Sequence, residues 1–454
     1  MEDKVARILE EVSRRITPTD DEKEKELEVV RKIIRRISGS RRGIKALLCG
    51  SLARDTHLRG ERDLDIFVLF NKNVPKQEFE KEGIKVGLEA LAGYEHWLEY
   101  SEHPYVKGIV DGYEVEIVPC YKVKKACELK SSVDRSPFHA RFLKRNLKPE
   151  QRKEARLLKA FMKGIGCYGA DISKEGFSGY LAELLILKYG DFISCIKAAS
   201  EWRPGLRIAL DEKHLRKCDA LGNLVFPDPT DPKRNVASAV SLEQFARFVA
   251  ASKAFLKRPS KKFFFGEKKK KISKANAIRA IKKRNLVVVK IDLKTLRGRD
   301  TIHGQMKRFK NLVSGWLKRN GFLVLNEVVI DLESTVYCAV EVEEKKLGNL
   351  KKITGPPVFD ERNVAAFLKK HKKIVSGPRI ENDRIVIVEE AKGRVDFIVV
   401  KEIVNFLSKR GKEPLKSLLK SAKVLEGKTL IKECEKSTFR EALIEFVIGK
   451  EVFF

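Results

Sequence analysis

The stretch from Cys49 to Phe70 constrains the fold and the chemistry of this chain more than any other. An apolar run ends at a Gly50-Ser51 turn, and a second apolar run then carries Asp63 and Asp65. Because strand side chains alternate between two faces, the two aspartates are expected on one face and their apolar neighbours on the other. Close carboxylates repel each other unless a cation lies between them, and Mg²⁺ prefers such oxygen ligands beside phosphate. The stretch therefore predicts a strand-borne metal site next to a turn.

Two further features strengthen this prediction. Ser51 offers a hydroxyl and Arg54 a guanidinium, and either can bind phosphate. A later strand carries Glu114 and Glu116 on one face, and a two-metal site for phosphoryl transfer needs a third carboxylate. The alternative is an ordinary acidic sheet face exposed to solvent. Beside the aspartate pair we favour Glu116 as the third metal ligand.

Composition narrows the class of partner. The chain has 454 residues, which predicts two to four domains. Lys and Arg number 94 against 63 acidic residues, a net charge of +31 that favours a polyanion such as nucleic acid. There is no apolar run long enough to cross a membrane, and the charged N-terminus argues against a signal peptide. The eight cysteines lack Cys-x-x-Cys spacing, so we expect reduced core cysteines in a cytoplasmic protein.

Apolar periodicity and turn signals predict the elements. The expected strands are 44–49, 64–70, 94–100, 105–110, 113–118, 285–293, 322–331, 336–343, 384–388 and 394–400. The expected helices are two within 1–37, then 75–91, one from about 154, 181–188, one from 241, 304–320, 363–370, 401–409, 414–421 and 439–449. We predict an α+β multidomain chain: a mixed-sheet palm (1–147), a helical central domain (148–270) and an α+β C-terminal body with a helical tail (271–454).

Three segments outside the acidic strands carry candidate ligands for phosphate or RNA. Lys159, Tyr168, Ser178 and Tyr180 could line a triphosphate, although a solvated lysine at 159 and a core tyrosine at 180 are the simpler interpretations of those residues alone. The segment 226–236 reads as a rigid, proline-rich loop that could hold a base-reading guanidinium. The basic face of helix 304–320 could follow an RNA backbone, or could simply be solvated.

The motifs together resemble the archaeal (class I) CCA-adding enzymes, which are tRNA nucleotidyltransferases of the DNA polymerase β-type superfamily. The resemblance covers most of the chain and is strongest over 46–270. The matching stretches include Gly-Ser-Leu-Ala-Arg at 50–54, Asp-Leu-Asp-Ile-Phe at 63–67, Glu-Val-Glu-Ile-Val-Pro-Cys-Tyr at 114–121, Gly-Phe-Ser-Gly-Tyr at 176–180 and Asp-Pro-x-Asp-x-Lys-Arg-Asn-Val-Ala at 228–237.

The resemblance implies roles for particular residues. The family's metal carboxylates correspond to Asp63, Asp65 and Glu116. Its nucleotide contacts correspond to Ser51, Arg54, His139, Lys159 and Tyr168, with Arg234 at the position that reads the incoming base. Two carboxylates differ from the usual pattern: Asp63 stands where the family usually has Glu, and Glu116 where it usually has Asp.

The resemblance also implies the reaction and its partners. We expect template-independent addition of C, C and A to the 3′ end of tRNA from CTP and ATP, with two Mg²⁺ ions per site and release of pyrophosphate. A homodimer is implied as well. One alternative is a poly(A) or oligoadenylate-type polymerase that uses ATP alone. The other is a catalytically silent RNA-binding protein on the same scaffold.

Overall fold

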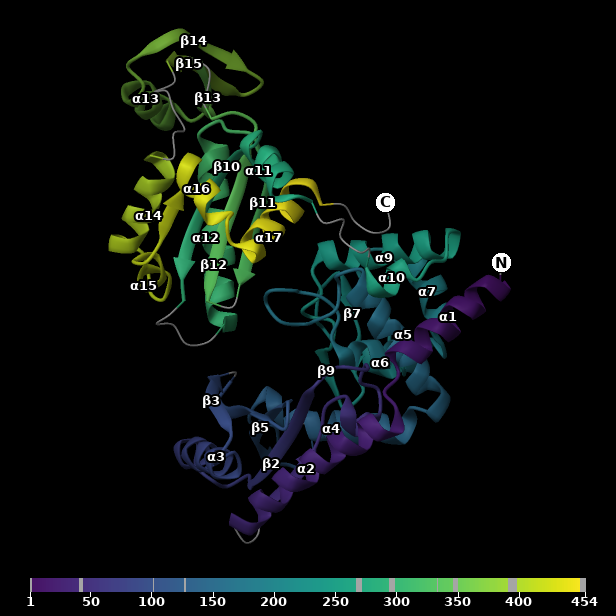
Figure 1. Cartoon of the computed structure of the whole chain (residues 1–454). Coiled ribbons are helices and arrows are strands. Elements are labelled where there is room, and N and C mark those ends of the chain that lie inside the picture. The colour runs from purple at the N-terminus through teal and green to yellow at the C-terminus, as the bar shows by residue number, and fades with distance from the viewer. Residues whose placement is uncertain are drawn as a thin grey trace. The chain divides into compact units, whose positions relative to one another are not determined.

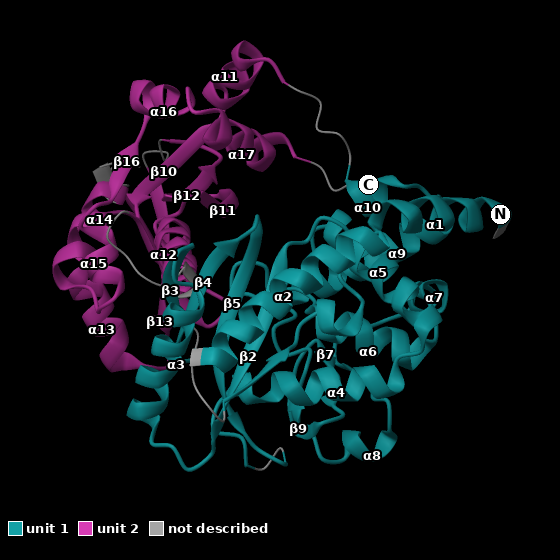
Figure 2. Ribbon diagram, turned by 60° about the horizontal axis from the view of Figure 1, so that its bottom comes forward, with its two compact units in different colours: residues 1–269, 451–454 teal, residues 270–450 magenta. Residues whose placement is uncertain are grey.

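The chain divides into two compact units, residues 1–269 and residues 270–450 (Figures 1 and 2). The computed structural model describes residues 2–40, 44–100, 102–125, 128–266, 272–293, 299–332, 334–345, 350–390 and 398–449. In these ranges no helix combines the length and apolarity needed to cross a membrane. Each of the seven cysteines described is free and buried, as predicted for core thiols, whereas Cys127 lies outside the described residues.

The first unit contains a five-stranded mixed sheet, which confirms the predicted palm architecture. Its strands are β1 (Lys45–Leu48), β2 (Asp63–Asn71), β3 (Glu95–Tyr100), β4 (Pro104–Val110) and β5 (Tyr113–Lys122). Their spatial order is β1-β2-β5-β4-β3. Only the β2–β5 pair is parallel, and the other neighbours within this sheet run antiparallel. The parallel pair places the two acid-bearing strands side by side.

Two helices, α2 (Asp20–Ser40) and α3 (Lys76–Ala90), cover one face of this sheet (Figure 1). Leu64 and Ile66 of β2 are buried in the same apolar cluster as side chains of both helices. Since side chains alternate along a strand, Asp63 and Asp65 lie on the opposite face. The predicted separation of acids from core residues is therefore confirmed.

Helices build the rest of the first unit around a phenylalanine-rich core. They are α1 (Glu2–Ile16), α4 (Ser136–Asn146), α5 (Pro149–Gly164), α6 (Gly179–Tyr189), α7 (Phe192–Ser200), α8 (Glu212–Leu215), α9 (Leu242–Lys257) and α10 (Lys262–Phe265), with short helical turns η1 (Leu52–Arg54) and η3 (Ser132–Arg135) and a small strand pair β6 (Leu206–Arg207) and β7 (Leu224–Val225). Val12 and Ile16 of α1 belong to this core, so the N-terminal helix packs with residues far along the chain.

The segment 226–236 is not the loop we predicted. It contains a short antiparallel pair, β8 (Pro227–Asp228) and β9 (Asp231–Asn235). The Asn235 amide holds the base of this hairpin, because its oxygen accepts from the Phe226 N–H at 2.9 Å and its nitrogen donates to the Leu224 carbonyl at 3.0 Å. Prolines suggested a loop, but Pro at the edge of such a short pair removes no ladder bond.

The second unit combines two antiparallel sheets with helices. The larger sheet has the order β11-β12-β10-β16 and the smaller β13-β15-β14. The strands are β10 (Asn285–Asp292), β11 (Val324–Leu332), β12 (Thr335–Val342), β13 (Leu350–Pro357), β14 (Ile374–Glu381), β15 (Arg384–Glu390) and β16 (Lys423–Leu425); the helices are α11 (Lys274–Lys282), α12 (Arg299–Arg319), α13 (Glu361–Lys370), α14 (Ile398–Arg410), α15 (Leu415–Leu419), α16 (Gly427–Glu433) and α17 (Ser437–Ile448).

The strand predicted at 394–400 is wrong where it can be examined. Residues 391–397 lie outside the described residues, and 398–400 form the first turn of α14. The β-branched run there favoured a strand. However, Val400, Ile403, Val404 and Leu407 recur at helical spacing and pack into the same core, so the tertiary contacts of the helix outweigh local propensity.

Candidate active site

A sharp turn positions the candidate phosphate-binding segment against the acidic strand. Gly50 has a φ of +65°, and a Cβ at this position would lie 1.8 Å from Oδ2 of Asp65. Only glycine therefore fits here without displacing that carboxylate. The Cys49 N–H donates to the Asp65 carbonyl at 2.9 Å. Ser51 and Arg54, which follow the turn, are consequently held beside the acidic face of β2.

The acids of β2 and β5 lie in register on one face of the sheet. Asp63 is opposite Glu114, and Asp65 is opposite Glu116. Burial and the charge of Glu116 raise the pKa of Asp65 to about 6, and burial and Glu114 raise the pKa of Asp63. Crowded negative charge of this kind fits a bound cation.

Glu116 is engaged by a lysine that we did not predict. Lys107 of β4 lies opposite Glu116 in the sheet, and its Nζ donates to Oε1 of Glu116 at 2.9 Å and also pairs with Glu114. Among the described residues, no three His, Cys, Asp or Glu side chains are arranged to hold a metal ion. The structure therefore brings Asp63, Asp65 and Glu116 to one sheet face but does not assemble them into a ligand set.

Two of the predicted phosphate ligands meet on a buried carboxylate, Glu183 of α6. Arg54 Nε donates to Glu183 Oε2 at 2.9 Å, and Lys159 Nζ donates to Glu183 Oε1 at 2.7 Å. The Thr56 hydroxyl also bonds to Glu183. Burial alone would raise the pKa of Glu183, but Arg54 and Lys159 outweigh burial and the pKa is lowered. Arg54 and Lys159 therefore share one buried carboxylate.

Sequence reasoning missed Glu183, although a signal was present. It is the one acidic residue in the helical run Leu181-Ala182-Glu183-Leu184-Leu185-Ile186, in which every side chain is buried. A carboxylate inside an apolar run must be paired to remain charged. Lys159, interpreted as either a solvated lysine or a ligand, is only 1% exposed. The solvated alternative is therefore wrong.

Tyr168 lies next to this cluster. A Cβ added at Gly179, the first residue of α6, would lie 2.8 Å from the Tyr168 hydroxyl and 3.7 Å from Lys159 Nζ. Burial raises the pKa of Tyr168, so its hydroxyl keeps its proton and can donate a hydrogen bond. Arg54, Lys159 and Tyr168, predicted from separate segments, are thus gathered at the start of α6.

The second predicted group converges on another buried carboxylate, Asp228 of the β8–β9 hairpin. His139 Nε2 lies 2.8 Å from Asp228 Oδ2, and Arg234 Nη1 donates to the same oxygen at 3.0 Å. The Tyr180 hydroxyl donates to Oδ1 at 3.2 Å. His139 and Tyr180 are stacked, with ring centroids 3.8 Å apart. Burial lowers the pKa of His139, although Asp228 opposes the effect, and the positive charges of Arg234 and Arg54 lower it further.

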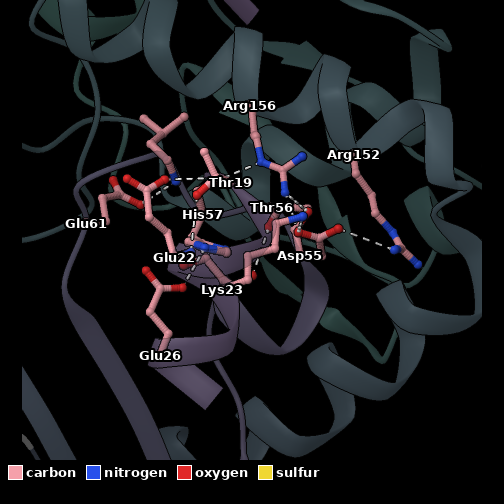
Figure 3. Close-up of polar contacts among 12 residues, drawn as sticks. Thr19, Glu22, Lys23, Glu26, Asp55, Thr56, His57, Glu61, Arg152 and Arg156 are labelled. Carbon is pink, nitrogen blue, oxygen red and sulfur yellow. Dashed lines mark hydrogen bonds and ion pairs between the residues drawn. The ribbon is translucent and has the colours of Figure 1, made fainter. Parts of the chain in front are cut away.

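A polar network holds the loop that directly follows Arg54 and contains Asp55 and His57 (Figure 3). Asp55, whose φ is +51°, accepts a bond from Arg156 of α5 and pairs with Lys23 of α2 at 3.0 Å. His57 Nε2 lies 2.9 Å from Glu26 Oε2, and both side chains are buried. The loop is therefore tied to both the sheet-covering helix α2 and the helical core.

Comparison with known proteins gives matches along nearly the whole chain. Three protein-family models match: a nucleotidyltransferase domain over residues 27–145, the second domain of tRNA nucleotidyltransferase over 153–265, and the C-terminal domain of CCA-adding enzyme over 286–427. The three ranges fall within the palm, central and C-terminal parts that we predicted, but the domain boundaries themselves stay a prediction.

Individual relatives are similar over most of their own length. The CCA-adding enzyme of Methanocaldococcus jannaschii is 38% identical over 82% of this chain and 85% of that protein. The CCA-adding enzyme of Archaeoglobus fulgidus is 34% identical over 95% of this chain and 97% of that protein. The CCA-adding enzyme of Saccharolobus shibatae is 35% identical over 87% of this chain and 92% of that protein.

Proposed function

The chain belongs to the archaeal CCA-adding enzymes, and from this membership we infer that it adds the terminal C, C and A to tRNA, using CTP and ATP. The observation that carries the inference is the identity of 34% over 97% of the A. fulgidus enzyme. In this chain, the range that matches the nucleotidyltransferase domain, residues 27–145, contains the acidic strands β2 and β5. The relatives do not favour a polymerase that uses ATP alone or a catalytically silent RNA-binding protein.

In each cycle the 3′ oxygen of the RNA forms a bond to the α-phosphorus of the incoming nucleotide. The bond between the α-phosphorus and the bridging oxygen breaks, and pyrophosphate leaves. Nucleotidyltransferases of this family depend on a divalent metal. We propose that Asp63, Asp65 and Glu116 hold two Mg²⁺ ions, which when bound acidify the attacking hydroxyl and neutralise the triphosphate. For Glu116 to take part, its bond to Lys107 must be exchanged for the ion.

The side chains around the turn would bind the triphosphate. Arg54 and Lys159 carry positive charges that attract phosphate, and the water-poor surroundings strengthen that attraction. Ser51 and the protonated Tyr168 hydroxyl can donate hydrogen bonds. Arg234 and His139 would contact the base. A homodimer and a cytoplasmic location remain predictions.

The test is an extension assay with Mg²⁺ and tRNA lacking its last three nucleotides, read at single-nucleotide resolution. We expect two additions with CTP alone and a third when ATP is also supplied. Long A-tails would instead indicate a poly(A)-type enzyme, and tRNA binding without extension would indicate a silent scaffold.

A variant separates the metal assignment from the family assignment. Asp65→Ala should abolish extension while leaving tRNA binding unchanged, because it removes a carboxylate that both ions would share. Asp219→Ala is the matched control, since Asp219 is exposed. Extension by Asp65→Ala at the wild-type rate would overturn the proposed ligand set.

A further inference from the structure

We propose that Asp228 is the positioning residue for base selection: it orients Arg234 and His139 so that only the correct nucleobase is bound productively. The proposal rests on the proposed function, because it takes the group around Arg234 as the part of the site that meets the base. It gives a role to Asp228, which lies in a stretch that resembles the family but to which the resemblance assigned no role.

Asp228 is fully buried and receives five donors, so its position is strongly determined. Oδ2 faces His139 Nε2 and Arg234 Nη1, at 2.8 and 3.0 Å. Oδ1 accepts from the Tyr180 hydroxyl at 3.2 Å, and from the Thr230 N–H and hydroxyl at 2.9 and 2.8 Å. A carboxylate offers about four acceptor sites, so this one is saturated. It is ionised as well: burial would raise its pKa, but the hydrogen bonds from His139 and Thr230 lower the pKa far below its ordinary value.

The donors come from three separate elements. His139 lies on α4, Tyr180 on α6 and Arg234 on β9. The hairpin is further tied to the palm side by Arg135 of η3, whose Nε donates to Asp231 at 3.2 Å. Movement of any one element relative to the others would break a bond to Asp228. The Asp228 carboxylate therefore fixes the positions of Arg234 and His139 relative to each other.

One nitrogen of the Arg234 guanidinium is bound by Asp228, and the rest of the side chain is partly exposed to solvent. The bound nitrogen is Nη1, and the side chain is 34% exposed. A guanidinium has five N–H donors in a rigid plane, so fixing one nitrogen fixes the direction of the others. A base edge that presents acceptors to that plane is bound, whereas an edge that presents donors there leaves the guanidinium N–H groups unpaired.

Glu183 and Asp228 organise two different parts of the site, one for the triphosphate and one for the base. Glu183 gathers Arg54 and Lys159, which would contact phosphates common to every nucleoside triphosphate. Asp228 gathers Arg234 and His139, which would contact the part that differs between nucleotides. Loss of Glu183 should lower kcat/KM for all four nucleotides by the same factor. Loss of Asp228 should change the ratio of kcat/KM between nucleotides.

The experiment measures kcat/KM for CTP and for UTP on tRNA lacking its last three nucleotides. Asp228→Asn keeps the shape but replaces one acceptor oxygen with a donor. We expect the CTP-to-UTP ratio to fall at least tenfold, with extension still dependent on Mg²⁺. Asp219→Asn is the control for an exposed aspartate of the same unit, and its ratio should equal that of the wild type.

A double-mutant cycle tests whether Asp228 acts through Arg234. Arg234→Ala should lower the ratio, and adding Asp228→Asn to it should lower the ratio no further. A decrease that simply adds would show a general structural role and overturn the proposal. Tyr180→Phe, which deletes one donor to Asp228, should reduce the CTP-to-UTP ratio less than Asp228→Asn does, and only when Arg234 is present. If Asp228→Asn does not fold, Tyr180→Phe tests the positioning role in its place.

The outcomes distinguish failure of the proposed CCA-adding function from failure of the positioning role of Asp228. If the wild type does not add CCA, the proposed function fails before any variant is examined. If the wild type adds CCA and Asp228→Asn keeps the wild-type ratio while its rate falls, the proposed function stands and the positioning role is overturned.

Discussion

At the scale of single residues, buried carboxylates organise the cations of this site. Glu183 is fully buried between Lys159, which is also buried, and Arg54. Ions removed from water lose several kcal/mol of hydration, and only close, complete pairing restores it. The two cations therefore stay where they are because of a residue that itself would touch no substrate.

Replacing Glu183 with Gln should destabilise the first unit strongly. Removing one partner of a buried ion pair costs about 3–5 kcal/mol, and we expect a loss in this range from urea unfolding. The matched control is Glu243→Gln, which breaks an exposed pair with Arg247 at 3.1 Å; exposed pairs contribute about 1 kcal/mol or less. Equal losses in the two variants would contradict the role given to Glu183.

The effect of Glu183 should depend on pH in a defined direction. Its pKa in the folded protein lies below the ordinary 4.5, so the folded state favours the ionised form. The resulting stabilisation is complete above pH 4.5 and is lost as the pH falls through the lower, folded-state pKa. The difference in unfolding free energy between wild type and Glu183→Gln should therefore shrink below pH 4.5. A difference that grows with acidification would contradict the pairing.

Lys107 should compete with metal for Glu116. Its Nζ lies 2.9 Å from the Glu116 carboxylate, so Lys107→Gln removes a resident positive charge from the site. We expect calorimetric titration with Mn²⁺ to show several-fold tighter binding in the variant. Lys122→Gln, at an exposed position on the same sheet, should leave the affinity unchanged. Weaker binding in Lys107→Gln would show that the lysine orients Glu116 for the ion instead.

At the scale of elements, the site depends on the contact between the Gly50 turn and β2. The turn reverses the chain between β1 and the acidic strand, and the left-handed backbone at Gly50 permits this. The parallel pairing of β2 with β5 then aligns the acids of both strands. Neither the turn nor the strand pair alone would place Ser51 beside Asp65.

Gly50→Ala should reduce extension activity at least a hundredfold, since its Cβ would collide with the Asp65 carboxylate. Gly60→Ala is an unusually close control. Gly60 also has a left-handed φ, +83°, but a Cβ there would meet nothing within 4 Å. The backbone conformation should cost each variant about 1–2 kcal/mol of stability, and the collision adds to this cost at Gly50; urea unfolding measures both. Equal activity in the two would show that the contact with Asp65 is unimportant.

At the scale of the whole molecule, charge is distributed for a polyanionic partner. The net charge is +31. In the second unit, α12 buries Ile302, Met306, Phe309, Val313 and Leu317 in the core, and Arg308 and Lys318 on the same helix are exposed. The predicted amphipathic helix is confirmed, and its contact with RNA stays a prediction.

Binding of tRNA by the full chain should depend steeply on salt. Each phosphate neutralised by a Lys or Arg releases a counterion, so log affinity falls linearly with log salt concentration. We expect the affinity to fall at least ~10-fold between 50 and 200 mM KCl in a filter-binding titration, as expected for several phosphate contacts. Arg308→Gln should reduce the slope by about 1 if that side chain contacts a phosphate. A slope near zero would contradict electrostatic recognition.

Local patterns in the sequence determined a good part of this protein. Strand alternation placed Asp63 and Asp65 opposite Leu64 and Ile66, because that alternation follows from backbone geometry alone. Helical spacing likewise predicted α12. Composition predicted the sign of the partner's charge, since charge is additive and independent of the fold. Motifs carried the family resemblance and indicated the candidate site residues.

Only the tertiary structure decided which of these residues act together. Arg54 and Glu183 are 129 residues apart, and His139 and Asp228 are 89 apart. No local period reports such contacts, because they depend on how α4, α6 and the β8–β9 hairpin pack. Lys107 faces Glu116 through strand register, and Val400 lies in a helix whose apolar side chains pack into a core made by distant residues. Local sequence specified the face, type and charge of the candidate site side chains; packing decided their partners, because a buried charge persists only where the fold supplies its counter-charge.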